Sequence, residues 1–355
     1  MTDFSEFDRA MMRRALELAQ KGLYTTTPNP RVGCVVTQGE RTVGEGWHER
    51  AGGPHAESAA LEQAGSAAAG ATLYVSLEPC NHHGRTPPCV AAIIRSKAKR
   101  VVAAMLDPNA TAAHGGDALR AAGIRFEHGL MEEQARELNI GFVSRMTRAR
   151  PWVRLKVAAS LDGRTALSDG RSQWITGPDA RRDGHHWRAR ACAILTGIGT
   201  VRADNPRLTV REVQTTRQPL RVVVDSRLET PKDARVLEGE KVLVFAGREG
   251  ELPNAEVICL PNENRKVDLP KMLEELARRG VNELHVEAGF RLNGSLAREG
   301  CVDEYLVYLN PSFLGSGAEG MLDIPEPATL AERRRLKLLS VERLGEDLRI
   351  LARPA

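Results

Sequence analysis

The sequence has few cysteines, no long apolar run and little excess of either charge, and each shortage excludes a class of protein. Six cysteines among 355 residues are too few for a disulfide framework, so we expect reduced thiols and a cytoplasmic protein. No segment approaches the roughly 18 consecutive apolar residues that cross a membrane, and the first residues lack the pattern of a secretory signal. The net charge of +4 gives no broad basic surface for nucleic acid, which favours a small-molecule substrate.

Strand-like and helix-like segments alternate along the chain, which is typical of an α/β fold, and the length favours two domains. In the first half, the patterns predict helices near residues 8–22, 55–64, 90–97 and 116–122, and strands near 32–36, 42–47, 72–77, 101–106 and 124–127. In the second half, they predict helices near 178–191 and 269–279, strands near 152–158, 193–196, 220–225, 241–245, 283–287 and 304–309, and a closing hairpin at 337–351. The basic stretch 145–150 is either a linker or a charged helix end. We place the domains at 1–147 and 148–355.

The residues most informative about chemistry are one histidine, one glutamate and two cysteines. His55 and Glu57 are separated by one residue, and Cys80 and Cys89 each follow a proline. One imidazole and two thiolates make a three-ligand zinc site with a fourth position open for water, as in catalytic sites. Zinc lowers the pKa of such a water to about 7, and Glu57 is placed to carry its proton to a leaving amine. We therefore expect a zinc-dependent deaminase acting on a pyrimidine-like amine.

Three ordinary interpretations compete with this one: a surface histidine, two buried cysteines, or a purely structural metal. The order of the four residues favours catalytic zinc over all three. The prolines before His55, Cys80 and Cys89 also predict three helix starts, whose partial positive charge favours thiolate. Eight residues separate the two cysteines, against two in the general nucleobase-deaminase signature. His82 and His83 in this loop are rival ligands, which we interpret as substrate contacts or solvated residues.

Two glycine-rich segments are candidates for binding a dinucleotide. Residues 315–320 fit the G-x-G-x-x-G string, but Pro325 and Pro327 follow, so no helix opens there and we interpret the segment as a surface loop. Residues 289–295 lie between a predicted strand and a short helix, where backbone N–H groups would hold phosphates. An ordinary strand-to-helix turn explains the same spacing equally well.

Several longer motifs, in fixed order, resemble one known family over nearly the whole chain. They are Thr27–Gly33, His55–Glu57 and Glu78–Cys89 in the first half, and Lys156–Arg164, Ser172–Thr176, Thr200–Thr209 and Val286–Gly289 in the second. In these motifs, and in the lengthened cysteine loop, the chain is similar to the bifunctional riboflavin-biosynthesis deaminase/reductases. The resemblance implies an α/β fold with an N-terminal cytidine-deaminase-like three-layer domain and a C-terminal dihydrofolate-reductase-like domain. It also implies a homo-oligomer.

The resemblance further implies two consecutive reactions. The first domain would use zinc to hydrolyse an amino group from a diaminopyrimidinone that carries a ribosylamino 5′-phosphate. The second would reduce the ribosyl group to ribityl with NADPH, whose contacts the resemblance assigns to Ala158, Trp174, Thr200, Asp204, Ser226, Gly289, Phe290, Arg291, Leu292, Asn293, Gly294 and Ser295. For the substrate it assigns Asn29, Lys156, Ser172, Arg188, Leu208, Arg211 and Glu287. The two arginines suit the phosphate because their planar fork binds it in bidentate fashion.

Each of these residues taken singly also has an ordinary interpretation. Asn29 fits an Asn-Pro turn, Trp174 a core residue, Arg188 a solvated helix face and Asp204 a turn before a proline. His48 and the loop 107–109 are further substrate candidates, and Arg227 is a candidate partner for the 2′-phosphate that distinguishes NADPH from NADH. We interpret His185 and His186 as helix-surface residues.

Other functions remain open on the residues alone. A single-activity deaminase of tRNA or free nucleosides would use the second half as a binding appendage, and on RNA it would show a steep salt dependence. A non-catalytic module would use zinc only for folding, and Glu57→Gln would then change nothing else. A chain that has lost one of two activities is the third option, which separate assays of ammonia release and NADPH oxidation would detect.

Overall fold

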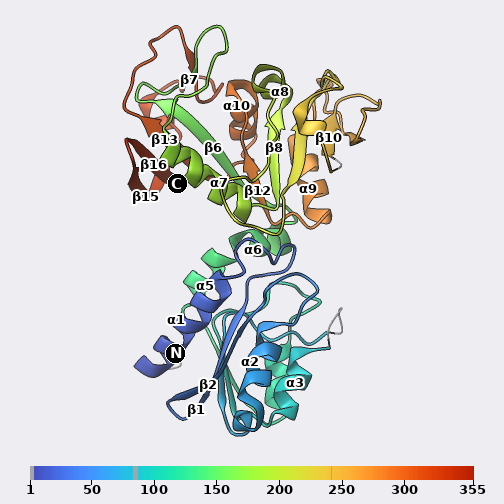
Figure 1. Cartoon of the computed structure of the whole chain (residues 1–355), viewed down its shortest axis with the longest axis vertical. Coiled ribbons are helices and arrows are strands. Elements are labelled where there is room, and N and C mark those ends of the chain that lie inside the picture. Colours follow the sequence, from blue (N-terminus) through green and yellow to red (C-terminus); the bar gives the residue numbers. More distant parts are fainter. Residues whose placement is uncertain (1–3, 83–86, 241) are drawn as a thin grey trace. The chain divides into compact units, whose positions relative to one another are not determined.

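The computed structural model describes residues 4–82, 87–240 and 242–355, and the chain divides into two compact units (Figure 1). Unit 1 comprises Met1–Ala149 and unit 2 comprises Arg150–Ala355. Each unit has its own sheet and its own apolar core. Among the described helices, none is long and apolar enough to cross a membrane.

Unit 1 is built on a five-stranded sheet in the order β2-β1-β3-β4-β5. β1 is antiparallel to both of its neighbours, whereas β3, β4 and β5 run parallel. The strands are β1 (Gly33–Gln38), β2 (Arg41–Trp47), β3 (Thr72–Val75), β4 (Arg100–Ala103) and β5 (Arg125–His128). The helices are α1 (Glu6–Gln20), α2 (Ala56–Ala64), the short η1 (Gly65–Ala68), α3 (Cys89–Arg95), α4 (Gly115–Ala121), α5 (Glu132–Leu138) and α6 (Ile140–Arg148).

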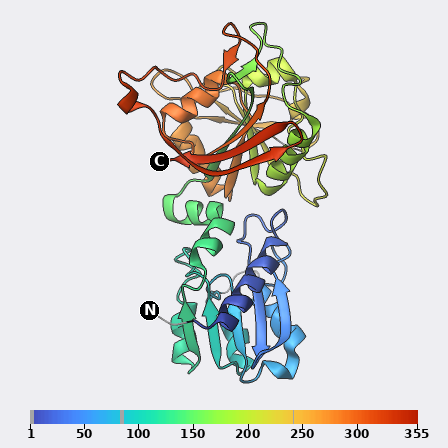
Figure 2. The same cartoon turned by 90° about the vertical axis from the view of Figure 1, so that its left-hand side faces the viewer.

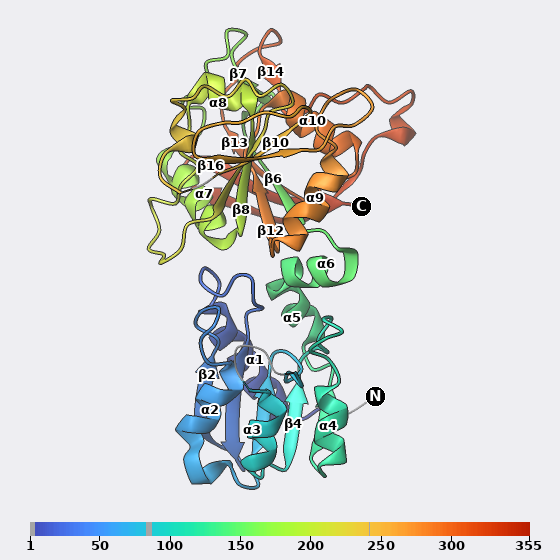
Figure 3. The ribbon, with the colours of Figure 1, turned by 90° about the vertical axis from the view of Figure 1, so that its right-hand side faces the viewer.

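The alternation of residues along the strands divides the core of unit 1 into two apolar layers. Cys34 and Val36 of β1 pack with α2, α3 and α4 on one face of the sheet, and Val35 packs with α1, α5 and α6 on the other. Figure 3 shows α2, α3 and α4 over one face, and Figure 2 shows α1 over the opposite face. The three-layer arrangement predicted for the first domain is confirmed.

Unit 2 is built on a nine-stranded sheet in the order β11-β10-β9-β8-β12-β6-β13-β16-β15. The strands from β11 to β13 are parallel, and β16 and β15 close the sheet as an antiparallel hairpin. They are β6 (Trp152–Ser160), β8 (Ala193–Gly197), β9 (Leu220–Val224), β10 (Val242–Ala246), β11 (Ala255–Cys259), β12 (Glu283–Val286), β13 (Glu304–Asn310), β15 (Leu336–Leu344) and β16 (Asp347–Pro354). Because parallel strands end at the same edge, the carboxyl ends of seven strands collect in one row, where α/β sheets bind ligands.

Helices cover both faces of this sheet. α7 (Pro178–Arg190) and α8 (Ile198–Asp204) pack on one face, and α9 (Leu269–Arg278) and α10 (Phe290–Arg298) pack on the other. A second, two-stranded sheet pairs β7 (Arg164–Ala166) with β14 (Glu319–Gly320), and η2 (Arg235–Leu237) and η3 (Leu330–Glu332) are short 3-10 helices. The α/β fold predicted for the second half is confirmed.

The structure adds elements that the sequence patterns do not predict, namely α5, α6, α8, β7, β11 and β14. The basic stretch 145–150 is a helix end, and the two units also divide within it, between Ala149 and Arg150. Arg145 and Arg148 lie in the last turn of α6, where cations suit the partial negative charge of the carbonyl end, and Ala149 closes the helix with φ of 54°.

Candidate active sites

Three candidate metal ligands of unit 1 converge on one point. His55 caps the N-terminus of α2, Cys89 is the first residue of α3, and Cys80 lies in the segment after β3. The His55 Nδ1 atom lies 3.2 Å from Cys89 Sγ and 3.5 Å from Cys80 Sγ, and the three ligand atoms all lie within 4.8 Å of one another. Ligand atoms in a tetrahedral zinc site, with bonds of about 2.1–2.3 Å, are separated by about 3.5–3.8 Å. The donor set and its spacing therefore fit zinc.

Local packing explains why these ligands meet. A Cβ on Gly46 of β2 would lie 2.5 Å from the carbonyl oxygen of Ala56, so glycine lets the first turn of α2 rest directly on the strand. The backbone N–H of Cys89 donates to Cys80 Sγ at 3.4 Å. The Cys89 side chain lowers the pKa of the Cys80 thiol. Burial would raise this pKa, but the His55 ring lowers it further. The predicted helix start at Cys80 is wrong, because this residue lies in an irregular segment; its thiolate is stabilised by side-chain and backbone donors instead.

Glu57 lies in the first turn of α2 and is only 3% exposed. Burial raises the pKa of its carboxyl to about 7. A carboxyl of this kind can accept and release a proton near neutral pH, as a general acid–base residue must. Glu57, the second residue of α2 and two residues beyond the cap, thus gives the cluster a proton carrier without a fourth protein ligand.

Asn29 and His48 form a short hydrogen-bonded chain beside the cluster. His48 Nδ1 lies 2.9 Å from the Pro54 carbonyl oxygen, so this nitrogen carries the proton and Nε2 accepts from Asn29 Nδ2 at 3.0 Å. The backbone N–H of Asn29 donates to the Thr26 carbonyl at 2.8 Å, so the residue belongs to a turn, and its side-chain amide still reaches His48. This orientation leaves Oδ1 of Asn29 as the acceptor for a ligand.

The loop 107–109 is held in place by Glu78, a residue that the sequence patterns leave without a role of its own. Its carboxylate accepts from the backbone N–H groups of Asp107 at 3.1 Å and Gly116 at 2.8 Å. Burial raises the pKa of Asp107 to about 6. His82 is not part of the metal cluster, and His83 lies outside the described residues.

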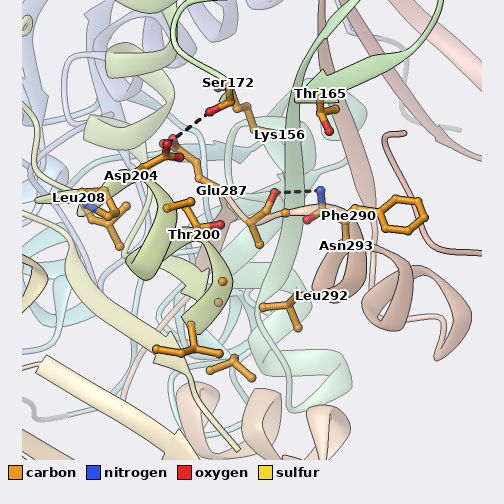
Figure 4. Close-up of a pocket in the computed structure, with 18 of the residues that line it drawn as sticks. Lys156, Thr165, Ser172, Thr200, Asp204, Leu208, Glu287, Phe290, Leu292 and Asn293 are labelled. Carbon is orange, nitrogen blue, oxygen red and sulfur yellow. Dashed lines mark hydrogen bonds between the residues drawn. The ribbon is translucent and has the colours of Figure 1, made fainter. Parts of the chain in front are cut away.

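Unit 2 contains a cavity of about 1600 Å³ at the carboxyl ends of its parallel strands (Figure 4). Nearly all residues predicted to bind NADPH or the substrate in the second half line it, namely Lys156, Ala158, Ser172, Trp174, Arg188, Thr200, Asp204, Leu208, Arg211, Ser226, Glu287, Gly289, Phe290, Arg291, Leu292, Asn293 and Ser295. Gly294 is the exception. It faces away from the cavity, where a Cβ would lie 2.2 Å from the carbonyl oxygen of Asp323.

A charged cluster forms one wall of the cavity. Arg188 grips Glu287 in bidentate fashion, with Nε to Oε1 at 2.5 Å and Nη2 to Oε2 at 2.9 Å, and its Nη1 donates to the Thr209 carbonyl. Against the effect of burial, Arg188 holds the pKa of Glu287 well below its usual range. Burial lowers the pKa of the nearby Lys156. Of the two arginines predicted to bind phosphate, Arg188 already pairs with Glu287 through Nε and Nη2, whereas Arg211 is exposed.

The segment 289–295 forms the start of a helix, as a phosphate cradle requires. Gly289 is the N-cap of α10, and no side chain caps the free N–H groups of its first turn. Asn293 Nδ2 donates to the Ala288 carbonyl at 3.0 Å and fixes the turn from within (Figure 4). Opposite, Asp204 accepts from Ser172 Oγ at 3.2 Å.

The structure also brings basic residues to the cavity that the sequence patterns miss. Arg248, Arg265 and Lys266 follow β10 and β11 and line the cavity together with Arg227. Ser226 ties their loops together, because its carbonyl accepts from Gly247 N at 3.1 Å and its Oγ accepts from Val267 N at 3.1 Å. The sequence does show a basic residue after each of β9, β10 and β11, which could have indicated an anion site. Only the sheet order shows that the ends of these strands are neighbours.

Two interpretations of single residues are wrong. His185 is buried rather than on the helix surface, because α7 turns it toward the segment before Arg211, whose N–H donates to His185 Nδ1 at 3.1 Å. Trp174 is not a core residue, since it is 70% exposed at the cavity, with the Arg181 guanidinium 4.8 Å from its ring.

Two family models match the chain. The cytidine and deoxycytidylate deaminase zinc-binding region matches residues 5–105, and the RibD C-terminal domain matches residues 151–350. The riboflavin biosynthesis protein RibD of Escherichia coli is 44% identical over 96% of this chain and 98% of that protein, and the RibD of Aquifex aeolicus is 44% identical over 97% of each. The solved structure of Acinetobacter baumannii RibD, form 1, matches with a TM-score of 0.93 and 42% identity over 99% of both chains. A Thermotoga maritima diaminohydroxyphosphoribosylaminopyrimidine deaminase/5-amino-6-(5-phosphoribosylamino)uracil reductase matches with a TM-score of 0.90 and 35% identity over 98% of this chain and 99% of that one.

Proposed function

Because this chain belongs to the family of the riboflavin biosynthesis protein RibD, we propose that the two sites described above carry out its two reactions with the residues named there. The protein is a bifunctional zinc-dependent deaminase and NADPH-dependent reductase of riboflavin biosynthesis. The match of the second half to a reductase family favours this function over a single-activity deaminase with a binding appendage. We assign the deaminase to residues 1–147 and the reductase to residues 148–355.

The observation that carries the assignment of the deaminase residues is the cluster of His55, Cys80 and Cys89 with buried Glu57 beside it. These three residues would hold the zinc, which acidifies a water molecule when bound. Glu57 would take a proton from the attacking water, whose oxygen bonds to the ring carbon, and would pass it to the amino group, so that the C–N bond breaks and ammonia leaves. Asn29, fixed by His48, accepts a hydrogen bond from the pyrimidine edge.

In the reductase, conversion of ribosyl to ribityl adds a hydride to C1′, breaks the C1′–O4′ bond and adds a proton to O4′. NADPH supplies the hydride when bound. The start of α10 would hold its phosphates, with Ala158, Trp174, Thr200, Asp204 and Ser226 along the rest of the cofactor. Glu287, held by Arg188, and Lys156 bind the sugar, and Arg211 binds the 5′-phosphate with Ser172 and Leu208 nearby.

The 2′-phosphate of the cofactor would bind at the basic loops after β9, β10 and β11. Arg227 alone is a weak site, because its side chain is 81% exposed and lies 3.9 Å from Glu229. Arg248, Arg265 and Lys266 have no ion-pair partner among the described residues, which leaves their charge for an anion. Replacing Arg248 and Lys266 with Gln should raise the KM for NADPH and leave that for NADH unchanged; an equal effect on both would refute this site.

We also propose a cytoplasmic homo-oligomer. The six cysteines are all free thiols in the structure, which suits a reducing compartment. At the edge of the unit 2 sheet, β15 exposes Leu336, Leu338, Leu339 and Val341. A long apolar edge strand usually pairs with another chain.

The decisive experiment for the deaminase is Glu57→Gln. The variant should keep its zinc and lose deamination by about 10²–10⁴-fold, because the proton carrier is gone while all ligands remain. NADPH oxidation with the deaminated intermediate should be unchanged. Glu62→Gln, on the exposed face of the same helix, is the matched control. Normal ammonia release by Glu57→Gln, or loss of zinc, would overturn the assignment.

A further inference from the structure

A buried histidine without an obvious role lies on β12, directly behind the cavity wall. Along this strand, Leu284 and Val286 face the apolar core, so Glu283, His285 and Glu287 share the opposite face. His285 is 0% exposed, and neither of its ring nitrogens makes a well-aligned hydrogen bond among the described residues. Buried polar groups are nearly always satisfied, so such an imidazole requires an explanation.

The surroundings of His285 are charged on three sides. β6 contributes Arg154, which is its register partner, and α7 contributes Arg188. On its own strand, Glu287 Oε1 lies 3.3 Å from His285 Nε2. On β8, the register partner is the apolar Ile194. Burial lowers the pKa of His285 despite the opposite effect of the Glu287 carboxylate, and Arg154 and Arg188 lower it further. The ring is therefore neutral and can present a single N–H.

We propose that His285 is a positioning residue of the reductase, which holds the Glu287 carboxylate in place from inside the sheet while Arg188 holds it from α7. Oε1 accepts from Arg188 Nε and lies 3.3 Å from His285 Nε2, close enough for a small rotation of the ring to bring its N–H into line, and Oε2 accepts from Arg188 Nη2. A carboxylate has about four acceptor positions, so this leaves one directed to the cavity that Glu287 lines. The ligand group that suits it is a sugar hydroxyl, which donates to an ionised carboxylate.

This inference rests on the proposed reductase function and assigns the orientation of one of its substrate contacts. A misplaced carboxylate would weaken binding of the sugar in the transition state more than it weakens binding in the ground state. The effect should therefore appear in kcat as well as in KM. Because His285 also supports the ionised form of Glu287, its loss should move the acidic limb of the pH–rate profile to higher pH.

The test compares His285→Gln with His285→Asn in the full chain, because both keep a polar amide and only the longer one can reach Glu287. His285→Gln should reduce NADPH oxidation less than threefold. His285→Asn should lower kcat/KM about tenfold or more, as expected when an ionised carboxylate loses a neighbouring donor, and should shift the acidic limb. Leu284→Met, on the opposite face of the same strand, is the control for general disturbance of the core.

Two further measurements keep the outcome decisive. Ammonia release by unit 1 in the same samples normalises for active protein, and a double change with Glu287→Gln tests coupling. Equal activity and equal pH profiles of His285→Gln and His285→Asn would overturn the proposal, as would additive effects in the double variant. If the unaltered chain fails to oxidise NADPH at all, the proposed reductase function fails instead.

Discussion

Gly46 of β2 lies beneath the first turn of α2, so Gly46→Ala should disturb the zinc site without altering a ligand. The new Cβ would lie 2.5 Å from the carbonyl oxygen of Ala56 and 2.6 Å from the N of Ala60. Both are backbone atoms, which cannot rotate away as the end of a flexible side chain can. Helix α2, with His55 at its cap and Glu57 in its first turn, must therefore move off the strand.

The geometry sets the size of this effect. Ordinary contacts of a Cβ begin at 3.4 Å, so the difference from 2.5 Å requires a shift of about 0.9 Å. Metal–ligand distances tolerate only about 0.2 Å, so the shift exceeds what the site absorbs without rearrangement. Overpacking of this kind costs about 1–3 kcal/mol of folding free energy. We expect zinc affinity to fall about 10–100-fold, the range seen when supporting residues of metal sites are changed.

Zinc affinity would be measured by competition with a chelator of known strength, and stability by urea denaturation of the same samples. Gly317→Ala is the control, since no atom of the described residues lies within 4 Å of its new Cβ and its φ is not in the left-handed region. It should leave both quantities unchanged. An unaltered zinc affinity in Gly46→Ala would refute the argument that β2 positions the metal site.

Three further predictions concern unit 2. Arg154→Met should destabilise it by about 1.5–3 kcal/mol in denaturant titration, because the buried carboxylates of Glu283 and Glu304 lose their shared partner and keep only Arg190 and Arg353; a change below about 1 kcal/mol would contradict this. Against the effect of burial, Arg154 lowers the pKa of Glu304. The ionised Glu304 therefore stabilises the folded state above the unfolded pKa of about 4.3, and this stabilisation is lost as the pH falls below that value. A constant unfolding free energy between pH 6 and pH 3 would contradict this. Leu338→Lys on the edge strand β15, where this side chain is 62% exposed, should lower the molar mass in light scattering; an unchanged oligomer would place the interface elsewhere.

The alternation of strands and helices could be predicted because long elements carry a clear period. The segments that escaped prediction are short or irregular. α5 and α6 adjoin each other at Asn139, whose side chain bonds the backbone of Arg31 from a distance of 108 residues, so tertiary contacts fix this corner. α8 is a single short helix of seven residues that begins after a glycine, with no capping side chain to signal it.

The three candidate zinc ligands could be singled out from the sequence because a metal restricts which residue types can hold it, and the structure brings these three together. The surroundings could not, because they depend on packing between distant segments. Nothing near His48 in the sequence shows that Pro54 selects its tautomer, and nothing near His285 shows that Arg154 and Arg188 flank it. The family resemblance assigns Gly294 to the cradle with its neighbours, but in a helix only some residues of a run can face one side.

The ligands of the zinc cluster all come from unit 1, and the walls of the large cavity all come from unit 2. Among the described residues, each centre is thus built from the side chains of its own half. What a single polypeptide does guarantee is stoichiometry: translation delivers the two catalysts in equal numbers, whatever the level of expression. Two genes making the halves separately would need matched regulation to achieve the same ratio.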